Sequence, residues 1–505
     1  MTFLSNGHLR FAVAVGAGAF AALGQAPYDM PVLMLLGLIC AIDMFRRSAT
    51  RWQAAAIGWG FGFGYFLHGW TWLVSPFMVD PERYAWMAPF ALVLMCGGLA
   101  LFWGLAFAVA RWMSPRIWPL VFCLTAAELL RGYLFTGFPW GMFSQGLVNT
   151  WPGQGLAFTG PYGLTLVFIA AACCVVHLFA RISPGYIIGA GFTALLAALL
   201  VVPFSRPDAP LGDATIRMVQ PNAAQKDKWD SFMIPQFFER QLEFTRAAPA
   251  SGAAAPDLIL WAETAIPWPL DIADGALSQI SFAAAGKPVV LGVQRRDGLQ
   301  FYNSAVLLGP VGEVLQTYDK HHLVPFGEYM PFGDFLSNFG IRSLASQFGN
   351  GYSSGSGAAL MDLGRLGLAL PLICYEAVFA RDVNAAPARP AFLMQLTNDA
   401  WFGKGQGPLQ HLAQARMRAI EQGLPMARVA NTGVSAMIDP WGRVTHSLGL
   451  NEAGFLDARL PLPRAPTLYS RWGELPVLAV LLIGLALCIM RRPKYLEFDP
   501  RGTDR

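Results

Sequence analysis

Residues 9 to 204 form a nearly continuous series of apolar runs, and this series limits the chain to folds that keep it out of water. A helix of about 20 apolar residues crosses a bilayer core of ~30 Å. By this measure we predict seven membrane spans before residue 205 and an eighth near the end of the chain. They cover residues 9–26, 30–45, 53–75, 88–110, 117–135, 162–180, 185–204 and 474–490. The 505 residues are 54% hydrophobic and 13% charged, which is too apolar for an ordinary soluble enzyme.

The start of the chain leaves two interpretations open. The first two apolar runs are short and are joined by the turn QAPYDMP, so we expect a hairpin that need not span the membrane fully. Residues 1–25 also have the pattern of a cleaved signal peptide, with Arg10 before an apolar run and small residues after it. Because the apolar series continues beyond this point, both interpretations place the later loops on the same sides.

Basic residues occur in alternate loops, which predicts the orientation of the chain. The basic positions are Arg46, Arg47, Arg51, Arg111, Arg116, Arg181, Arg491, Arg492 and Lys494. Cytoplasmic loops are enriched in Lys and Arg, so we predict cytoplasmic termini and an outward-facing domain. The predicted regions are residues 1–204 with seven helices, the domain 205–470, and residues 471–505 with the last helix and a short tail. We find no basic stripe with interleaved aromatics, and therefore expect no nucleic-acid partner.

The region 205–470 alternates strand-like and helix-like segments. The strand candidates are short apolar or β-branched runs bounded by Gly, Pro or Asp. They are residues 214–220, 257–263, 288–294, 303–309, 368–374, 391–397 and 434–440. Helices fit between the strands, for example at 230–246 and 411–423. We therefore predict an α/β sandwich of mixed sheets flanked by helices.

Three polar residues stand at the ends of these strand-like segments. Glu263 ends DLILWAE, Lys320 follows VLQTYD, and Cys374 ends LALPLIC. Side chains at the carboxyl ends of strands converge in α/β folds. An ammonium group favours a thiolate and stabilises an oxyanion, and a carboxylate can accept the thiol proton. The trio therefore predicts a cysteine nucleophile that forms a thioester.

Each of the three residues also has a simpler explanation. Glu263 fits a solvated strand-end charge, Lys320 a surface lysine, and Cys374 a small hydrophobic residue that finishes a core strand. Cys374 is the only cysteine of the outward domain, and an unpaired thiol in an oxidising compartment is either inert or reactive. The chain places all three residues directly after apolar or strand-like runs, in WAETAIP, YDKHHLVPFGEYMPF and ICYEAVF, which favours the reactive interpretation.

These three motifs resemble the Glu-Lys-Cys triad of the nitrilase superfamily of carbon–nitrogen hydrolases. Together with LTNDAWFG, ARMRAIEQGLPMARVANTG and the pattern of apolar spans, they make nearly the whole chain similar to the apolipoprotein N-acyltransferase family. The resemblance implies an αββα nitrilase-like domain on the periplasmic side of a multi-pass bundle in a bacterial inner membrane. It implies ping-pong transfer of an acyl chain from a phospholipid, mainly phosphatidylethanolamine, to the α-amino group of the S-diacylglyceryl cysteine of an apolipoprotein. It suggests a monomer and no cofactor.

The resemblance also assigns roles to individual residues. Cys374 is the expected nucleophile, Glu263 the general base and Lys320 the group that stabilises the tetrahedral intermediates. Glu328, Tyr375 and Glu376 match supporting residues of the family. The expected substrate-side residues are Trp229 in KDKWD, Trp401 in LTNDAWFG and Phe348 in the Gly- and Ser-rich loop 341–357. We interpret that loop as a mobile lid, with a plain surface loop as the alternative.

Several alternatives remain open at this stage. A membrane-anchored amidase or nitrilase that hydrolyses a small carbon–nitrogen substrate uses the same triad, but needs only one anchoring helix. A lipid transporter or a structural scaffold needs neither Cys374 nor Glu263. A Cys-His dyad with His411 or His446 is a further option. We expect no metal site, because adjacent residues such as His321 and His322 rarely bind one ion.

Two features of the membrane region have undecided roles. Glu128 and Arg131 are ionisable residues in the fifth span, and they either pair with each other or mark a lipid headgroup site. The aromatic segment 134–143 reads as an interfacial or re-entrant element, which is common without any substrate role.

Overall fold

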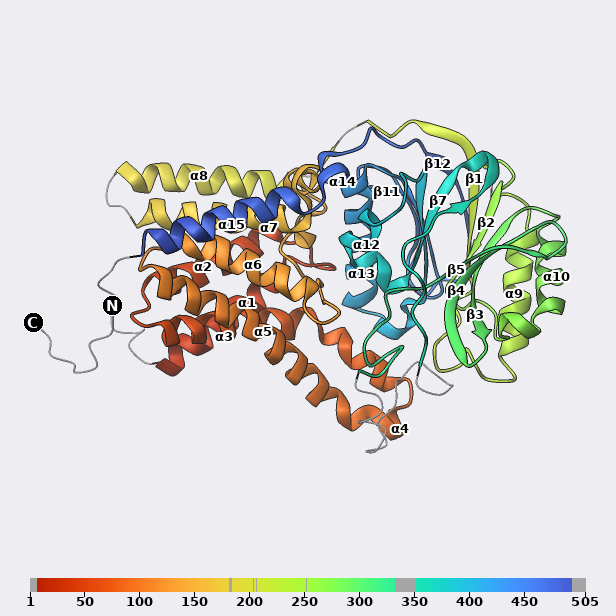
Figure 1. Cartoon of the computed structure of the whole chain (residues 1–505), viewed down its shortest axis with the longest axis horizontal. Helices are drawn as coiled ribbons and strands as arrows, with labels where there is room; N and C mark the ends of the chain where they lie inside the picture. Colours follow the sequence, from red (N-terminus) through yellow and green to blue (C-terminus); the bar gives the residue numbers. More distant parts are fainter. Residues whose placement is uncertain are drawn as a thin grey trace, which may run out of the picture.

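The computed structural model describes residues 7–180, 184–202, 204–205, 207–250, 252–331 and 351–492. Figure 1 shows two parts side by side, a bundle of long helices and an α/β part. The last long helix, in blue, returns from the α/β part and runs along the bundle. This arrangement matches the predicted fold class of a helical bundle joined to an α/β sandwich.

Each of the eight predicted spans coincides with a helix. These helices are α1 (Gly7–Ala22), α2 (Pro31–Arg46), α3 (Arg51–Gly69), α5 (Ala88–Met113), α6 (Pro119–Tyr133), α7 (Leu156–Phe179), α8 (Pro184–Val201) and α15 (Leu475–Met490). Within the described residues, two helical stretches are long and apolar enough to cross a bilayer, judged by length and composition only. They are Pro81–Met113 and Pro152–Phe179. The helices α1, α2 and α15 have 16 residues each and rise about 24 Å, which is shorter than the hydrocarbon core.

Glycines allow the first helices of the bundle to approach closely. A side chain at Gly18 would meet the backbone oxygen of Phe61 at 1.9 Å, and one at Gly64 would meet that of Val15 at 2.0 Å. Small residues at helix crossings permit this contact in membrane bundles. The packing of α1 against α3 therefore depends on these positions.

Short helices join the long ones. In the bundle they are η1 (Thr71–Met78), α4 (Pro81–Tyr84), η2 (Ala85–Met87), η3 (Gln145–Leu147) and η4 (Pro152–Gly155). In the α/β part they are η5 (Leu270–Ile272), η6 (Gly364–Leu366), η7 (Cys374–Val378), α12 (Ala380–Asn384), η8 (Asp399–Phe402) and α14 (Leu468–Trp472). The predicted span 53–75 ends early, because α3 stops at Gly69 and the chain continues in η1, which contains Pro76.

Two six-stranded sheets form the centre of the α/β part. The first has the order β12-β1-β2-β3-β4-β5 and the second β11-β10-β9-β8-β7-β6. The strands are β1 (Leu211–Gln220), β2 (Leu258–Trp261), β3 (Val289–Asp297), β4 (Gln300–Leu308), β5 (Val314–Asp319), β6 (Met361–Asp362), β7 (Leu368–Ile373), β8 (Phe392–Thr397), β9 (Met426–Ala430), β10 (Ser435–Ile438), β11 (Val444–Leu448) and β12 (Gly454–Pro461). Parallel pairs lie at the centre of each sheet and antiparallel pairs at the edges.

The sheets pack face to face around one apolar core, to which both contribute residues such as Met218, Leu260 and Met394. Helices α9 (Ile234–Arg246) and α10 (Asp274–Ala283) cover the outer face of the first sheet. Helix α13 (Gln406–Gln422) lies between the second sheet and the bundle (Figure 1). The αββα sandwich is therefore confirmed, and its second sheet is the one that faces the bundle.

Candidate active site

A sharp turn after β7 places Cys374 at the carboxyl end of that strand. Cys374 is the first residue of η7 and has φ +49, a left-handed conformation that costs a non-glycine residue of order 1–3 kcal/mol. Its carbonyl oxygen accepts a hydrogen bond of 3.2 Å from Gln395 Nε2 and lies 3.1 Å from His411 Nε2. The backbone of the thiol residue is thus held from the neighbouring strand β8 and from helix α13.

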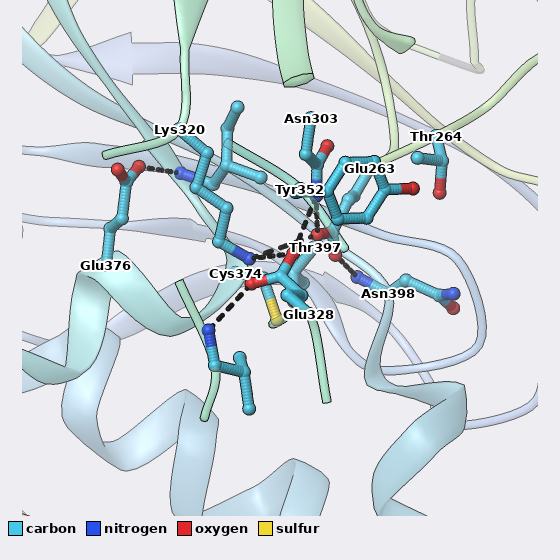
Figure 2. Close-up of polar contacts among 12 residues, drawn as sticks. Glu263, Thr264, Asn303, Lys320, Glu328, Tyr352, Cys374, Glu376, Thr397 and Asn398 are labelled. Carbon is cyan, nitrogen blue, oxygen red and sulfur yellow. Dashed lines mark hydrogen bonds and ion pairs between the residues drawn. The ribbon is translucent and has the colours of Figure 1, made fainter. Parts of the chain in front are cut away.

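The structure brings Glu263, Lys320 and Cys374 together, as the sequence predicts (Figure 2). Lys320 Nζ lies 3.4 Å from Glu263 Oε1 and 2.9 Å from Glu328 Oε1. The ammonium is 1% exposed, so both ion pairs are shielded from water. Two carboxylates and one thiol therefore surround a single fixed positive charge.

Two backbone or amide donors fix the carboxylate of Glu263. Asn303 Nδ2 donates to its Oε1 at 2.7 Å and to Glu328 Oε1 at 3.0 Å, and the backbone N–H of Asn398 donates to its Oε2 at 2.8 Å. The second oxygen of Glu328 accepts from the N–H of Val324 at 2.9 Å. These bonds stabilise ionised carboxylates in a buried site.

Burial and charge set the protonation of the three central groups. Burial raises the pKa of the Cys374 thiol, the negative charge of Glu263 raises it further, and Lys320 opposes this only in part. Burial alone would lower the pKa of Lys320, but Glu328 and Glu263 together raise it above its ordinary value. The effect of burial on the thiol therefore outweighs that of the ammonium group. The thiol is neutral and needs a base in contact with it.

Glu376 has a structural position beside Cys374. Its Oε1 accepts from Tyr318 Oη at 2.9 Å and from the N–H of His321 at 2.8 Å, and its Oε2 accepts from the N–H of Ile373 at 2.7 Å. Figure 2 shows this carboxylate pointing away from the cluster around Cys374. Glu376 thus braces the turn that carries the thiol.

Tyr375 connects the same turn to the helical bundle. Its hydroxyl donates to the carbonyl oxygen of Gly137 at 3.3 Å, and its ring packs edge-on against His322 and Phe379. Gly137 belongs to the aromatic segment 134–143, so this segment forms part of the junction between the two halves of the molecule.

An ion pair of α6 stabilises that junction. Arg131 and Glu128 are both fully buried and pair at 2.7 Å, which agrees with the pairing interpretation. Arg131 Nη1 also donates to the carbonyl oxygens of Phe138 and Trp140, the latter at 2.8 Å. The pair therefore fixes the segment that Tyr375 contacts.

The three predicted substrate-side residues have different surroundings. Trp229 lines a partly open pocket together with Glu263 and several apolar side chains. Trp401 is partly exposed on η8, in the segment that follows the Asn398 donor. Phe348 and residues 341–350 of the predicted lid lie outside the described residues. Tyr352, from the described end of that loop, is hydrogen-bonded by Gln294 Nε2 at 2.6 Å.

The alternative Cys-His dyad is wrong. Both ring nitrogens of His411 are occupied, Nδ1 by Asp399 Oδ1 at 2.8 Å and Nε2 by the carbonyl oxygen of Cys374. His446 lies exposed on β11, where it contacts Thr445. In the ranges that the structure describes, no group of three His, Cys, Asp or Glu side chains is arranged to hold a metal ion.

Sequence reasoning missed three residues that support the site and gave a fourth, His411, a different role. Asn303 and Asn398 hold the carboxylates, and Gln395 and His411 contact the carbonyl oxygen of Cys374. Asn303, Gln395 and Asn398 occur inside or directly after apolar strand segments, where a buried amide needs partners. A search for such amides is the signal that would have found these three.

Comparison with known protein families agrees with this fold. A family model described as carbon-nitrogen hydrolase matches residues 215–468, and one described as the apolipoprotein N-acyltransferase N-terminal domain matches residues 17–174. The α/β part thus has the fold of the carbon–nitrogen hydrolases. A mutant of the amidase from Nesterenkonia sp. AN1 is similar in structure, with 20% identity, a TM-score of 0.38, and coverage of 53% of this chain and 99% of the amidase.

Relatives that align over nearly the whole chain are more specific. The apolipoprotein N-acyltransferase of Rhodopseudomonas palustris is 36% identical, with 97% of this chain and 96% of the relative covered. That of Brucella melitensis is 37% identical, with 97% and 98% covered, and that of Bradyrhizobium diazoefficiens is 35% identical, with 97% and 96% covered. The chain therefore belongs to the apolipoprotein N-acyltransferase family, which confirms the resemblance found in the sequence.

Proposed function

We propose that the protein N-acylates apolipoproteins through a thioester on Cys374. The acyl donor is a phospholipid, mainly phosphatidylethanolamine, and the acceptor is the α-amino group of an N-terminal S-diacylglyceryl cysteine. The observation that supports this most is a neutral, buried thiol in one cluster with an ammonium group and two carboxylates, joined to a large apolar helical bundle. Moving a lipid chain into a water-exposed site costs about 0.8 kcal/mol per CH₂, which a site mounted on a membrane bundle avoids.

In the first half-reaction, Glu263 takes the proton of Cys374 as the sulfur attacks the ester carbonyl. The positive charge of Lys320 stabilises the oxyanion of the tetrahedral intermediate. The intermediate collapses to the thioester, and the protonated Glu263 donates its proton to the departing lysophospholipid oxygen. Glu328 keeps Lys320 charged and in place.

In the second half-reaction, Glu263 accepts a proton from the α-amino group of the acceptor as it attacks the thioester. Collapse of the second tetrahedral intermediate forms the amide and returns the proton to the Cys374 sulfur. Each residue therefore has the same role in both halves, as ping-pong chemistry requires. Trp229, Trp401 and Phe348 contact the substrates in this proposal, and Tyr375 and Glu376 support the turn of the nucleophile.

The proposed location is the bacterial inner membrane, with both termini cytoplasmic and the domain 205–470 in the periplasm. The bundle consists of residues 1–204 together with the helix in residues 471–505. The basic loops support this orientation, and the protein is proposed to act as a monomer.

Intact-protein mass spectrometry after incubation with phosphatidylethanolamine tests the chemistry, with Cys374→Ala as the control. We expect a mass increase of one acyl chain that neutral hydroxylamine removes and that the variant lacks. Release of ammonia from small amides or nitriles, without an acyl adduct from any phospholipid, would instead identify a membrane-anchored hydrolase.

A further inference from the structure

Lys228 is a buried ammonium group that the reaction above does not use. It lies between β1 and α9 and is 8% exposed. Its Nζ donates to the carbonyl oxygen of Glu263 at 3.3 Å and to Thr264 Oγ1 at 3.0 Å. Among the residues that the structure describes, no carboxylate oxygen lies within 4.0 Å of this nitrogen. Lys228 therefore binds the backbone of the proposed base instead of pairing with an acid.

A buried ammonium group such as that of Lys228 by itself destabilises the folded state. Burial lowers the pKa of Lys228 to about 8, although the charge of Glu263 raises it in part. A buried charge without a paired counter-charge destabilises a fold. Packing therefore does not explain a lysine here, and its two hydrogen bonds are the contacts that require an explanation.

Those bonds reach a strained turn. Thr264 has φ +44, which is rare for a β-branched residue and costs of order 1–3 kcal/mol. Strand β3 packs directly against the turn, because a Cβ atom at Gly292 would lie 2.6 Å from the Glu263 Cα. The N–H of Ala265 also donates to the carbonyl oxygen of Gly292 at 2.7 Å. A strained turn persists only where several neighbours hold it, and Lys228 supplies two of the bonds.

The turn determines where the carboxylate of Glu263 points. The side chain leaves the backbone at this turn and reaches Lys320 and the N–H of Asn398 on the second sheet (Figure 2). Lys228, Glu263 and Thr264 also line the same pocket, so all three lie at one site. Without Lys228 the turn could relax and carry the carboxylate away from Cys374.

We propose that Lys228 is a positioning residue for Glu263, which it aims at Cys374 by holding the 263–264 turn through its carbonyl and hydroxyl oxygens. The inference rests on the proposed role of Glu263 as the base. By this inference, the segment before α9 supports catalysis although it does not contact the reacting atoms.

The test compares Lys228→Met with Lys228→Arg, and uses Lys226→Met as the matched control because Lys226 is an exposed lysine of the same segment. Thioester formation is measured against phosphatidylethanolamine concentration in mixed micelles. We expect kcat to fall about 100-fold in Lys228→Met with KM unchanged, as for a small misplacement of a reacting group. Arginine should restore most of the rate, since it keeps the charge and the donors. An unchanged kcat in Lys228→Met, or an effect confined to KM, overturns the proposal.

Alkylation of Cys374 by iodoacetamide separates this inference from the proposed function, because it needs the base but no lipid. We expect slower alkylation in Lys228→Met and a normal rate in Lys226→Met, even if the wild-type protein forms no acyl adduct. Thr264→Val removes one acceptor and keeps the shape of the side chain, so its effect should not add to that of Lys228→Met. Additive effects, or slower alkylation in the control as well, contradict the proposal.

Discussion

The two sheets hold the proposed site in different ways. The second sheet carries Cys374 and faces the bundle, to which α13 and the segment 134–143 fasten it. The first sheet carries Glu263, and lies on the opposite side of the second sheet from the bundle (Figure 1). Cys374, the proposed nucleophile, is therefore held against the bundle, whereas Glu263, the proposed base, is held by neighbours on the first sheet and by the backbone N–H of Asn398.

One buried amide shows how strong the attachment of the second sheet is. Gln410 Oε1 accepts from the indole N–H groups of Trp72 at 3.1 Å and Trp140 at 2.8 Å. Its Nε2 donates to the carbonyl oxygens of Ala26 at 3.1 Å and Gly69 at 2.9 Å. Because these contacts attach only the second sheet to the bundle, we infer that the bundle helps to position Cys374, the proposed nucleophile, and does more than anchor the protein.

The largest expected effect comes from Glu263→Gln, which removes the proposed base from the first sheet, the one farther from the bundle. General bases contribute about 10²- to 10⁴-fold to a rate, so we expect thioester formation to slow by that factor while the fold is retained. Single-turnover kinetics followed by mass spectrometry would show it. Glu239→Gln, at an exposed glutamate of α9, should retain the wild-type rate. A variant within threefold of wild type would rule out Glu263 as the base.

Gln410→Leu tests the attachment of the second sheet. The change leaves two indole N–H groups and the carbonyl oxygen of Ala26 without the partner that Gln410 supplies, and each unsatisfied buried group costs about 1–3 kcal/mol. We expect a melting temperature in detergent lower by several degrees and slower thioester formation, since His411 is the next residue. Gln236→Leu, at an exposed glutamine of α9, serves as the control. Unchanged stability and rate would show that the bundle does not support the nucleophile.

The pH dependence of stability tests helix α13, which lies between the second sheet and the bundle. Burial raises the pKa of Glu421 from 4.5 to about 7, although Arg418 opposes this. A carboxyl with a raised pKa in the folded state stabilises most below pH 4.5, and this contribution is lost as pH rises through 7. We expect melting temperatures to decline across that window and the decline to flatten in Glu421→Gln. An equally steep decline in the variant would contradict the assignment.

The smallest expected effect comes from Arg381→Met at the edge of the junction. Its guanidinium donates to the carbonyl oxygen of Thr136 at 2.9 Å and is partly exposed. A hydrogen bond from a charged donor stabilises by roughly 1.5–3 kcal/mol. Solvent at this partly exposed position lowers the loss, so we expect a melting temperature only slightly below that of wild type. Arg365→Met, at an exposed arginine away from the bundle, provides the comparison for general charge loss.

Local patterns in the sequence predicted most of the fold. The eight apolar runs and the seven strand-like runs each coincide with an element, because length and apolar content are local properties. Strands β6, β9 and β12 were missed. β12 has only half of its eight residues buried and is placed by antiparallel pairing with β1, as in Val219 with Phe455, more than 200 residues away. Such a partner cannot be read from a short window.

The same division holds for the site. The ends of apolar strands indicated Glu263, Lys320 and Cys374, since the carboxyl ends of strands converge. The neutral state of the thiol, and the bonds that Asn398 and Lys228 make to Glu263, depend on burial and on contacts between distant segments. Sequence therefore predicted which groups meet, whereas the structure was needed to show how they are charged and aimed.

The way α13 and the turn after Cys374 pack has a practical consequence for work on the α/β half alone. Tyr375, Val378, Phe379, Met417 and Ile420 belong to the apolar cluster of the bundle. In a fragment that contains only residues 205–470, this apolar patch would be exposed to solvent. Gln410 would also lose its hydrogen-bond partners in the bundle. We expect such a truncated fragment to aggregate or to need detergent, and redesign of this patch to be the first step toward a crystallisable fragment.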